Sequence, residues 1–120
     1  MIRGVHTMFY TSEPEALRAF LRDVLDLTAT DVGDGWLIFD VPEAEMGCHP
    51  TGSGDAEEVA SGTPHISFYC DDLEATMREL RARGVEFVED AVDVGYGIRT
   101  SFRAPGDFTI ELYQPRYRKD

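Results

Sequence analysis

Two histidines and two glutamates have the residue types and the spacing for metal chemistry. His6 and His65 each open an apolar run, and Glu45 and Glu111 each lie in a later run of the chain. Two imidazoles and two carboxylates suit a divalent first-row ion such as Zn²⁺, Ni²⁺, Fe²⁺ or Mn²⁺. Such a set leaves two positions of an octahedral ion open, where the ion can polarise a substrate oxygen. The sequence therefore predicts one divalent metal site made by these four side chains.

Glu111 is the better supported of the two carboxylates. It lies between Ile110 and Leu112, and an unpaired carboxylate on an inward strand face is costly, so a nearby cation would explain its position. Glu45 is less secure, because the residues around it are already polar. Any one histidine or glutamate taken alone is more often hydrogen-bonded or solvated. The prediction therefore rests on the symmetric placement of all four.

His49 competes with Glu45 for a place in the site. It follows Glu45 by four residues, so strand alternation keeps both on one face. It can replace Glu45 as a ligand, carry a proton or line the cavity, and we favour cavity lining or acid/base work. Cys48 is adjacent to it, but neighbouring strand residues point to opposite faces, so we reject a cysteine–histidine nucleophile.

Four further side chains are candidates for substrate contact. Tyr10 and Tyr69 each follow a histidine by four residues, and their hydroxyls could lie beside the metal, although such paired aromatic residues more often pack. Arg99 and Arg103 are the candidate anchors for an acidic group of a substrate. A solvated strand face explains these two arginines equally well.

The elements that carry these residues form an internal repeat. Residues 6–21 and 65–80 match without a gap, with six identities in sixteen positions. The matched pairs are His6/His65, Phe9/Phe68, Tyr10/Tyr69, Glu15/Glu74, Ala16/Ala75 and Leu21/Leu80. Two copies are too few for a solenoid, so we expect one domain with pseudo-symmetric halves.

Each copy has the pattern of a strand, a helix and three further strands. The first strands are expected over 4–10 and 64–70, which are rich in Val, Ile, Phe and Tyr. The later strands that the sequence locates are 36–39 and 44–49 in the first copy and 86–89, 97–103 and 108–114 in the second.

A helix is expected after the first strand of each copy. Ser12 with Glu15 has the form of a capping box at the first helix, and Asp71 with Glu74 has the same form at the second. Gly84 is placed to end the second helix in a left-handed conformation.

The whole chain, residues 1–120, is expected to be a single α+β domain. It consists of two βαβββ modules over 1–52 and 63–116, joined by the polar, Gly- and Ser-containing linker 53–62.

Composition excludes several classes of partner. The net charge of −12 would repel nucleic acid and anionic membranes. No apolar stretch approaches the length of a membrane span and the N-terminus has no signal-peptide pattern, so we expect a cytoplasmic protein. Cys48 and Cys70 are expected as small buried side chains rather than as a disulfide.

With these motifs in place, the chain resembles the glyoxalase/bleomycin-resistance/dioxygenase family, the vicinal oxygen chelate proteins. The resemblance is carried by G-V-H-T-M, T-P-H-I-S-F and A-P-G-D-F-T-I-E-L. It implies that the two modules form a half-open barrel with the metal in its cup. The family's His, Glu, His, Glu pattern falls on His6, Glu45, His65 and Glu111, and the family's habit of pairing sheets between chains implies a homodimer.

The resemblance also implies metal-assisted proton transfer on a small oxygen-chelating substrate, as in a lyase or isomerase. Glu111 or Glu45 would be the base. Tyr10 stands where glyoxalase I enzymes have an arginine for the glutathione carboxylate, and His49 stands near their asparagine. These two differences argue against a true lactoylglutathione lyase. The alternatives are a ring-cleaving Fe²⁺ dioxygenase, with two histidines and Glu111 as a facial triad, and a metal-free drug-binding protein.

Overall fold

The computed structural model of the chain describes residue 1 and residues 6–41, 43–48, 51 and 59–118. These residues form a mixed fold of helices and strands, which confirms the predicted α+β class. In chain order, the elements are α1 (Pro14–Ala19), the π-helical turn η1 (Phe20–Val24), β1 (Thr28–Asp31), β2 (Leu37–Asp40), β3 (Ser67–Tyr69), α2 (Leu73–Ala82), β4 (Val92–Asp93), β5 (Gly97–Ala104) and β6 (Phe108–Pro115).

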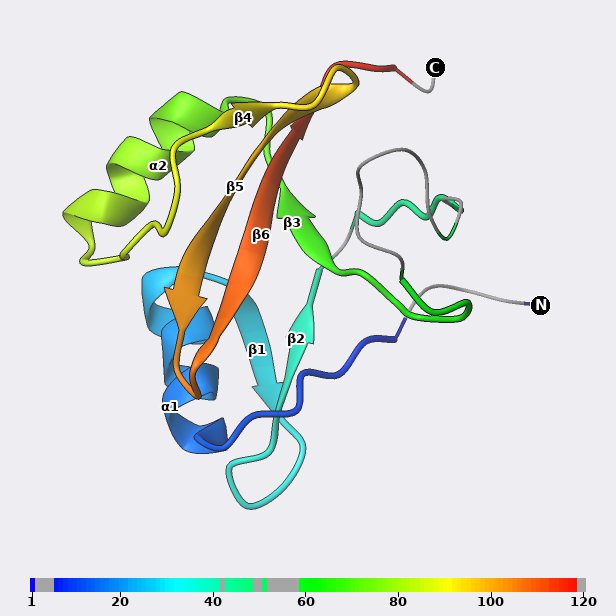
Figure 1. Cartoon of the computed structure of the whole chain (residues 1–120). Coiled ribbons are helices and arrows are strands. Elements are labelled where there is room, and N and C mark those ends of the chain that lie inside the picture. Colours follow the sequence, from blue (N-terminus) through cyan, green and yellow to red (C-terminus); the bar gives the residue numbers. More distant parts are fainter. Residues whose placement is uncertain (2–5, 42, 49–50, 52–58, 119–120) are drawn as a thin grey trace.

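The second half of the chain folds as one four-stranded sheet. The strand order is β3-β6-β5-β4, with β3 parallel to β6 and the other pairs antiparallel. Along the chain this is strand, helix and three strands, the order predicted for a module. The second half begins with β3. The chain then passes through α2 and the β4–β5 hairpin and returns as β6, which lies beside β3 (Figure 1).

The first half differs from its prediction. β1 and β2 form a separate antiparallel hairpin around the turn Gly33–Gly35, where Asp34 has φ of 52°. β2 matches the expected strand 36–39, but β1 was not predicted. The expected strands 4–10 and 44–49 are not strands at their described positions, 6–10 and 44–48. The tandem arrangement and the half-open barrel therefore stay predictions, and most of the linker 53–62 lies outside the described residues.

The predicted caps are each displaced by one residue. The first helix has Glu13 rather than Ser12 as its N-cap and no side-chain cap, because Pro14, with its fixed φ, takes the first helical position. Asp72, not Asp71, caps α2, and its carboxylate accepts from the Ala75 N–H. Gly84 does end α2 with φ of 91°, as predicted.

The expected strand 86–89 is reduced to an isolated bridge between Phe87 and Phe102. Two backbone hydrogen bonds still hold this segment beside β5, from Val88 N–H to the Ser101 carbonyl and from Arg103 N–H to the Glu86 carbonyl. The regular ladder stops there and resumes at β4, a strand that the sequence did not predict.

The core lies on one face of the four-stranded sheet. Alternate residues of β5 and β6 point to this face, where Phe102 and Ile110 are almost fully buried. The core residues are Leu17, Leu21, Leu73, Met77, Leu80, Val85, Phe102, Ala104, Ile110 and Leu112. They come mainly from the helices and from β5 and β6, and Figure 1 shows both helices on the same side of these two strands. The opposite face is left for polar side chains.

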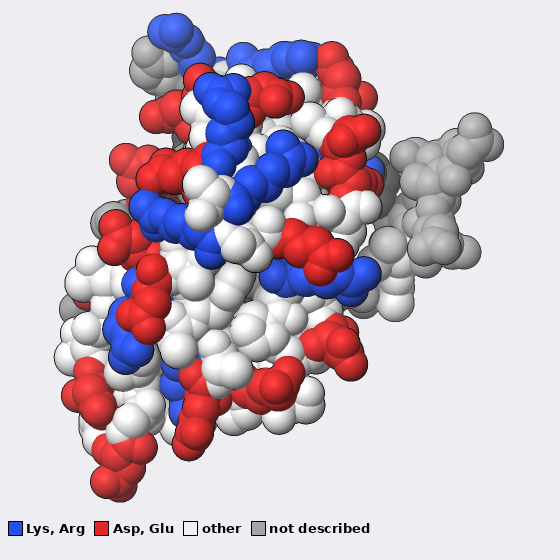
Figure 2. Space-filling model, turned by 90° about the vertical axis from the view of Figure 1, so that its left-hand side faces the viewer, with Lys and Arg blue, Asp and Glu red and all other residues white. Residues whose placement is uncertain are grey.

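The outer surface of the helix side carries charges of both signs. Figure 2 shows basic and acidic side chains interleaved there, without an extended basic surface. Within the part of the chain that the structure describes, no helix has the length and apolar character to cross a membrane. The cytoplasmic location stays a prediction.

A small clasp ties the segment before α1 to the β5–β6 turn. The Thr11 hydroxyl donates to the Pro105 carbonyl at 3.0 Å, and the Gly106 N–H donates to the Glu13 carboxylate at 2.9 Å. Gly106 has φ of 105°, and a Cβ added there would lie 1.8 Å from Thr11 Oγ1. The close approach therefore needs glycine at this position.

Gly106→Ala is expected to lower the free energy of unfolding by about 2–3 kcal/mol, since it adds a clash to an unfavourable backbone conformation. Gly95→Ala is the matched control, because Gly95 has φ of 91° with nothing within 4 Å of the added Cβ. It should cost only about 1 kcal/mol. Urea unfolding of the two variants measures the difference, and equal losses would contradict the clasp.

Candidate metal-binding and substrate site

The candidate site lies on the polar face of the four-stranded sheet. Glu111 of β6 pairs with Ser67 of β3 on one side and with Ser101 of β5 on the other. Its neighbours Ile110 and Leu112 point to the core face, so alternation directs Glu111 to the opposite face. His65 precedes Ser67 by two residues and therefore approaches from the same side.

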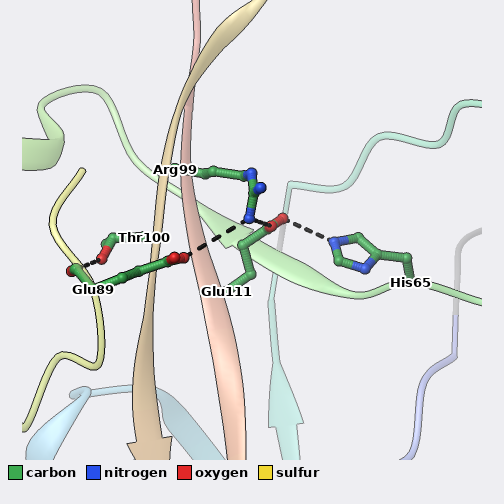
Figure 3. A network of polar contacts seen from close by, with 5 residues as sticks. All are labelled: His65, Glu89, Arg99, Thr100 and Glu111. Atoms are coloured by element: carbon green, nitrogen blue, oxygen red, sulfur yellow. Dashed lines mark hydrogen bonds and ion pairs between the residues drawn. The ribbon is translucent and has the colours of Figure 1, made fainter. Parts of the chain in front are cut away.

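A polar network joins His65, Glu111 and Arg99 (Figure 3). His65 Nε2 lies 2.8 Å from Glu111 Oε2, and Arg99 Nη1 lies 3.6 Å from Glu111 Oε1. Arg99 Nη1 also lies 3.8 Å from the carboxylate of Glu89. The segment that carries Glu89 is held from the core side by the buried hydroxyl of Thr100, which donates to the Glu89 carbonyl at 2.8 Å.

Exposure differs strongly across this network. The Glu111 side chain is 15% exposed, whereas that of His65 is 73% exposed. The carboxylate is thus largely removed from water, and the guanidinium of Arg99 supplies a cation beside it. The predicted need for positive charge at Glu111 is met in part by this arginine.

The spacing of His65 and Glu111 fits two ligands of one ion. Ligand atoms about 2.1 Å from an ion and at right angles to each other lie about 3.0 Å apart. The observed separation of 2.8 Å is close to this value, and it is also that of a hydrogen bond. Among the described residues, no group of three or more histidine, cysteine, aspartate or glutamate side chains is gathered for a metal. The chemistry of this pair fits a divalent ion, as two ligands of the predicted four.

His6 and Glu45, the predicted ligands of the first module, do not join this pair. His6 is exposed, and the Glu45 carboxylate accepts a hydrogen bond from the hydroxyl of Tyr117. This hydrogen bond is the main reason that the pKa of Tyr117 is raised. Glu45 therefore lies near the end of β6, where sequence reasoning placed no partner for it. His49, its rival, is outside the described residues.

Glu43 makes a similar contact one strand away. The Tyr69 hydroxyl donates to the Glu43 carboxylate at 3.1 Å. Removal from water, and then this hydrogen bond, raise the pKa of Tyr69. Sequence reasoning named Tyr69 but missed Glu43 and Tyr117, because these contacts join segments that no local pattern connects.

The other named residues lie apart from the pair. Tyr10 is 92% exposed, and Arg103 faces Glu86, with its Nε 3.3 Å from that carboxylate. Cys48 is exposed and only Cys70 is half-buried, so the expectation of two buried cysteines is half wrong. Burial raises the pKa of the Cys70 thiol.

Glu45→Gln is expected to lower the pKa of Tyr117, because it removes the carboxylate that raises it. In the folded parent this pKa lies above the unfolded value of about 10, so neutral Tyr117 stabilises the fold below about pH 10. This stabilisation is lost as the pH rises from about 10 towards the pKa of Tyr117 in the folded state. The free energy of unfolding of Glu45→Gln should therefore fall less over this pH range than that of the parent.

Ultraviolet titration of the phenols and alkaline unfolding measure these two effects. Subtracting the curve of Tyr117→Phe isolates Tyr117. A Tyr117 that titrates in the parent at the ordinary tyrosine value would contradict the contact with Glu45.

Comparison with known proteins shows the family to which the chain belongs. The sequence profile of the Glyoxalase/Bleomycin resistance protein/Dioxygenase superfamily matches residues 3–112. A search of curated proteins found no match.

Solved structures of similar fold include a lactoylglutathione lyase from Agrobacterium tumefaciens, with 19% identity, 90% of both chains covered and a TM-score of 0.62. They also include TnmS3, an antibiotic binding protein from Streptomyces sp. CB03234, with 18% identity, 96% of this chain and 99% of that chain covered, and a TM-score of 0.63. The fosfomycin resistance protein FosX from Listeria monocytogenes has 18% identity, coverage of 100% and 97%, and a TM-score of 0.56.

At these identities the likeness shows a shared fold, while the profile match extends over most of the sequence. The chain belongs to the Glyoxalase/Bleomycin resistance protein/Dioxygenase superfamily.

Proposed function

We propose that the protein is a metal-dependent enzyme of the lyase or isomerase type, which moves a proton on a small oxygen-chelating substrate. The observation that supports this proposal is the pair of His65 and Glu111, with ligand atoms 2.8 Å apart on the polar sheet face. A divalent ion held there, whether Zn²⁺, Ni²⁺, Fe²⁺ or Mn²⁺, would polarise oxygens of the substrate.

The protein's own side chains would bind, orient and exchange protons. Glu111 and Glu45 are the proposed bases, since a carboxylate close to a substrate carbon can accept its proton. His49 remains the proposed additional acid or base. Arg99 and Arg103 already face glutamates, so a substrate oxygen would share their N–H groups with these carboxylates.

We also propose a homodimer. Large apolar side chains are exposed at Met8, Tyr10, Val41 and Met46, with Tyr10 92% and Met46 78% exposed. Exposed apolar surface of this kind is typical of an interface. His6 and Glu45 lie within two residues of Met8 and Met46 in the sequence, so a second copy packed there would lie beside two predicted ligands.

A metal-free small-molecule binding protein is the second candidate. The observation that favours it is Arg99, whose guanidinium already stands 3.6 Å from Glu111 and leaves less need for a metal cation. A ring-cleaving dioxygenase needs a second histidine beside Glu111, and within the described ranges only His65 contacts it.

Metal content should separate the two candidates. Protein purified without chelator is expected to hold about one divalent ion per chain, and His65→Ala should bind it at least about tenfold more weakly because a ligand is lost. Arg103→Gln is the matched control, since the Arg103 guanidinium faces Glu86 rather than Glu111; it should leave metal affinity unchanged.

Arg99→Gln tests whether Glu111 is a metal ligand, because it removes a cation beside this carboxylate. It should raise metal affinity several-fold if Glu111 is a ligand. Metal-free parent protein that also fails to bind added Zn²⁺, Ni²⁺, Fe²⁺ or Mn²⁺ would overturn the enzyme proposal in favour of the binding protein.

The dimer makes its own prediction. Met46→Glu should weaken association, because it places a charge in the proposed interface, whereas Val88→Glu, at an apolar side chain 43% exposed elsewhere, should not. Sedimentation equilibrium measures both variants. A parent protein that is monomeric throughout the concentration range would contradict the dimer.

A further inference from the structure

Four tyrosines gather at one end of the polar sheet face. Tyr69 of β3 and Tyr113 of β6 are direct partners in the parallel ladder. Tyr96 precedes β5, and Tyr117 follows β6. The Tyr113 ring lies 6.1 Å from that of Tyr96 and 6.4 Å from that of Tyr117, so three of the rings form one continuous cluster. We call Tyr96, Tyr113 and Tyr117 the tyrosine cluster.

The central ring of the cluster is held by the backbone beneath it. A Cβ added at Gly97 would lie 2.6 Å from Cε1 of Tyr113 and 2.9 Å from its hydroxyl. The absence of a side chain at Gly97 therefore lets this ring lie close to β5. The Tyr113 hydroxyl also donates to the Tyr96 carbonyl at 3.4 Å. Tyr113 is thus a fixed platform.

The outer two rings remain accessible. Tyr96 is 57% exposed and Tyr117 is 43% exposed, although each already contacts Tyr113. Aromatic surface that is pre-ordered and open to water can take up a further ring by offset stacking or by an edge-to-face contact. Little conformational entropy would be lost, because Tyr113 and its neighbours already hold one another.

The cluster lies next to the proposed reaction site. Tyr113 follows Glu111 by two residues, so both side chains stand on the same sheet face about 7 Å apart along the strand. Arg99 is the direct strand partner of Tyr113. A molecule that rests on the rings would therefore extend towards Glu111.

The charges around the cluster restrict what it can take. Glu45 accepts from the Tyr117 hydroxyl, and Glu43 accepts from the Tyr69 hydroxyl. Arg99 and Arg116 also lie beside the cluster, but each is already paired with a carboxylate, Arg99 with Glu89 and Glu111 and Arg116 with Asp93. The two carboxylates at the rim therefore disfavour an anionic ring system, whereas the partly positive edge of an uncharged ring suits them.

We propose that the tyrosine cluster binds an uncharged planar aromatic group, which is the part of the substrate that lies beyond its metal-chelating oxygens. That this group is part of a metal-chelating substrate rests on the proposed function, whereas the binding of an aromatic group by the cluster does not. It assigns Tyr96, Tyr113 and Tyr117 to substrate recognition.

The test uses 1-naphthol as the aromatic probe and decahydro-1-naphthol as its saturated counterpart, in equilibrium dialysis against the full chain. Naphthol should bind more tightly than the saturated compound. Tyr96→Leu and Tyr117→Leu should each weaken naphthol binding by about three- to tenfold, the loss of one aromatic contact. Tyr117→Phe keeps the ring without its hydroxyl and should retain the affinity.

Trp36→Leu is the matched control, because Trp36 is another half-exposed aromatic residue and lies in the β1–β2 hairpin. This substitution should leave the affinity for naphthol unchanged. His65→Ala should also retain naphthol binding while it loses metal. Naphthol binding that depends on Tyr96 supports the proposal even in protein that holds no metal. Binding unchanged in Tyr96→Leu and Tyr117→Leu, or equal for the two probes, overturns it even where metal binds normally.

Discussion

The parallel pairing of β3 with β6 is the interaction on which the candidate site depends. It aligns Ser67 with Glu111 and Tyr69 with Tyr113, residues 44 positions apart in the chain. Without this ladder, His65 would have no reason to meet Glu111, and Tyr69 would not lie beside Tyr113. A parallel pair needs a crossover, and α2 with the β4–β5 hairpin provides it while burying the apolar face behind the site.

The same two strands serve two purposes through their alternation. On one face, Phe102, Ile110 and Leu112 form the core with the helices. The other face carries Arg99, Glu111 and Tyr113. Because core packing fixes the pleat of β5 and β6, it also fixes the direction of the polar side chains. The core thus sets the direction of Arg99 and Glu111, whereas His65 lies before β3 and is mostly exposed.

Much of the second half could be predicted, because β5 and β6 have clear patterns and Glu111 interrupts an apolar strand. The repeat identified His65 as the counterpart of His6. The first half was harder: β1 is the short, polar segment T-A-T-D, which no strand pattern distinguishes. Contacts such as those of Glu43 with Tyr69 and of Glu45 with Tyr117 depend on how distant segments meet. The N-caps were predicted one residue too early. Pro14 takes the first position of α1 and makes Glu13 the N-cap, and of the two adjacent residues Asp71 and Asp72, either of which could cap α2, the second does so.

The order in which the site can be assembled follows from the position of Glu111 in the ladder. During synthesis, His65 leaves the ribosome 46 residues before Glu111, and β6 must insert between β3 and β5 before the two side chains meet. Non-local pairing of this kind forms late in folding. Before that pairing, the imidazole of His65 and the carboxylate of Glu111 are apart in the nascent chain. The proposed metal ion would therefore bind only after β6 has joined the sheet and the core residues Ile110 and Leu112 are buried.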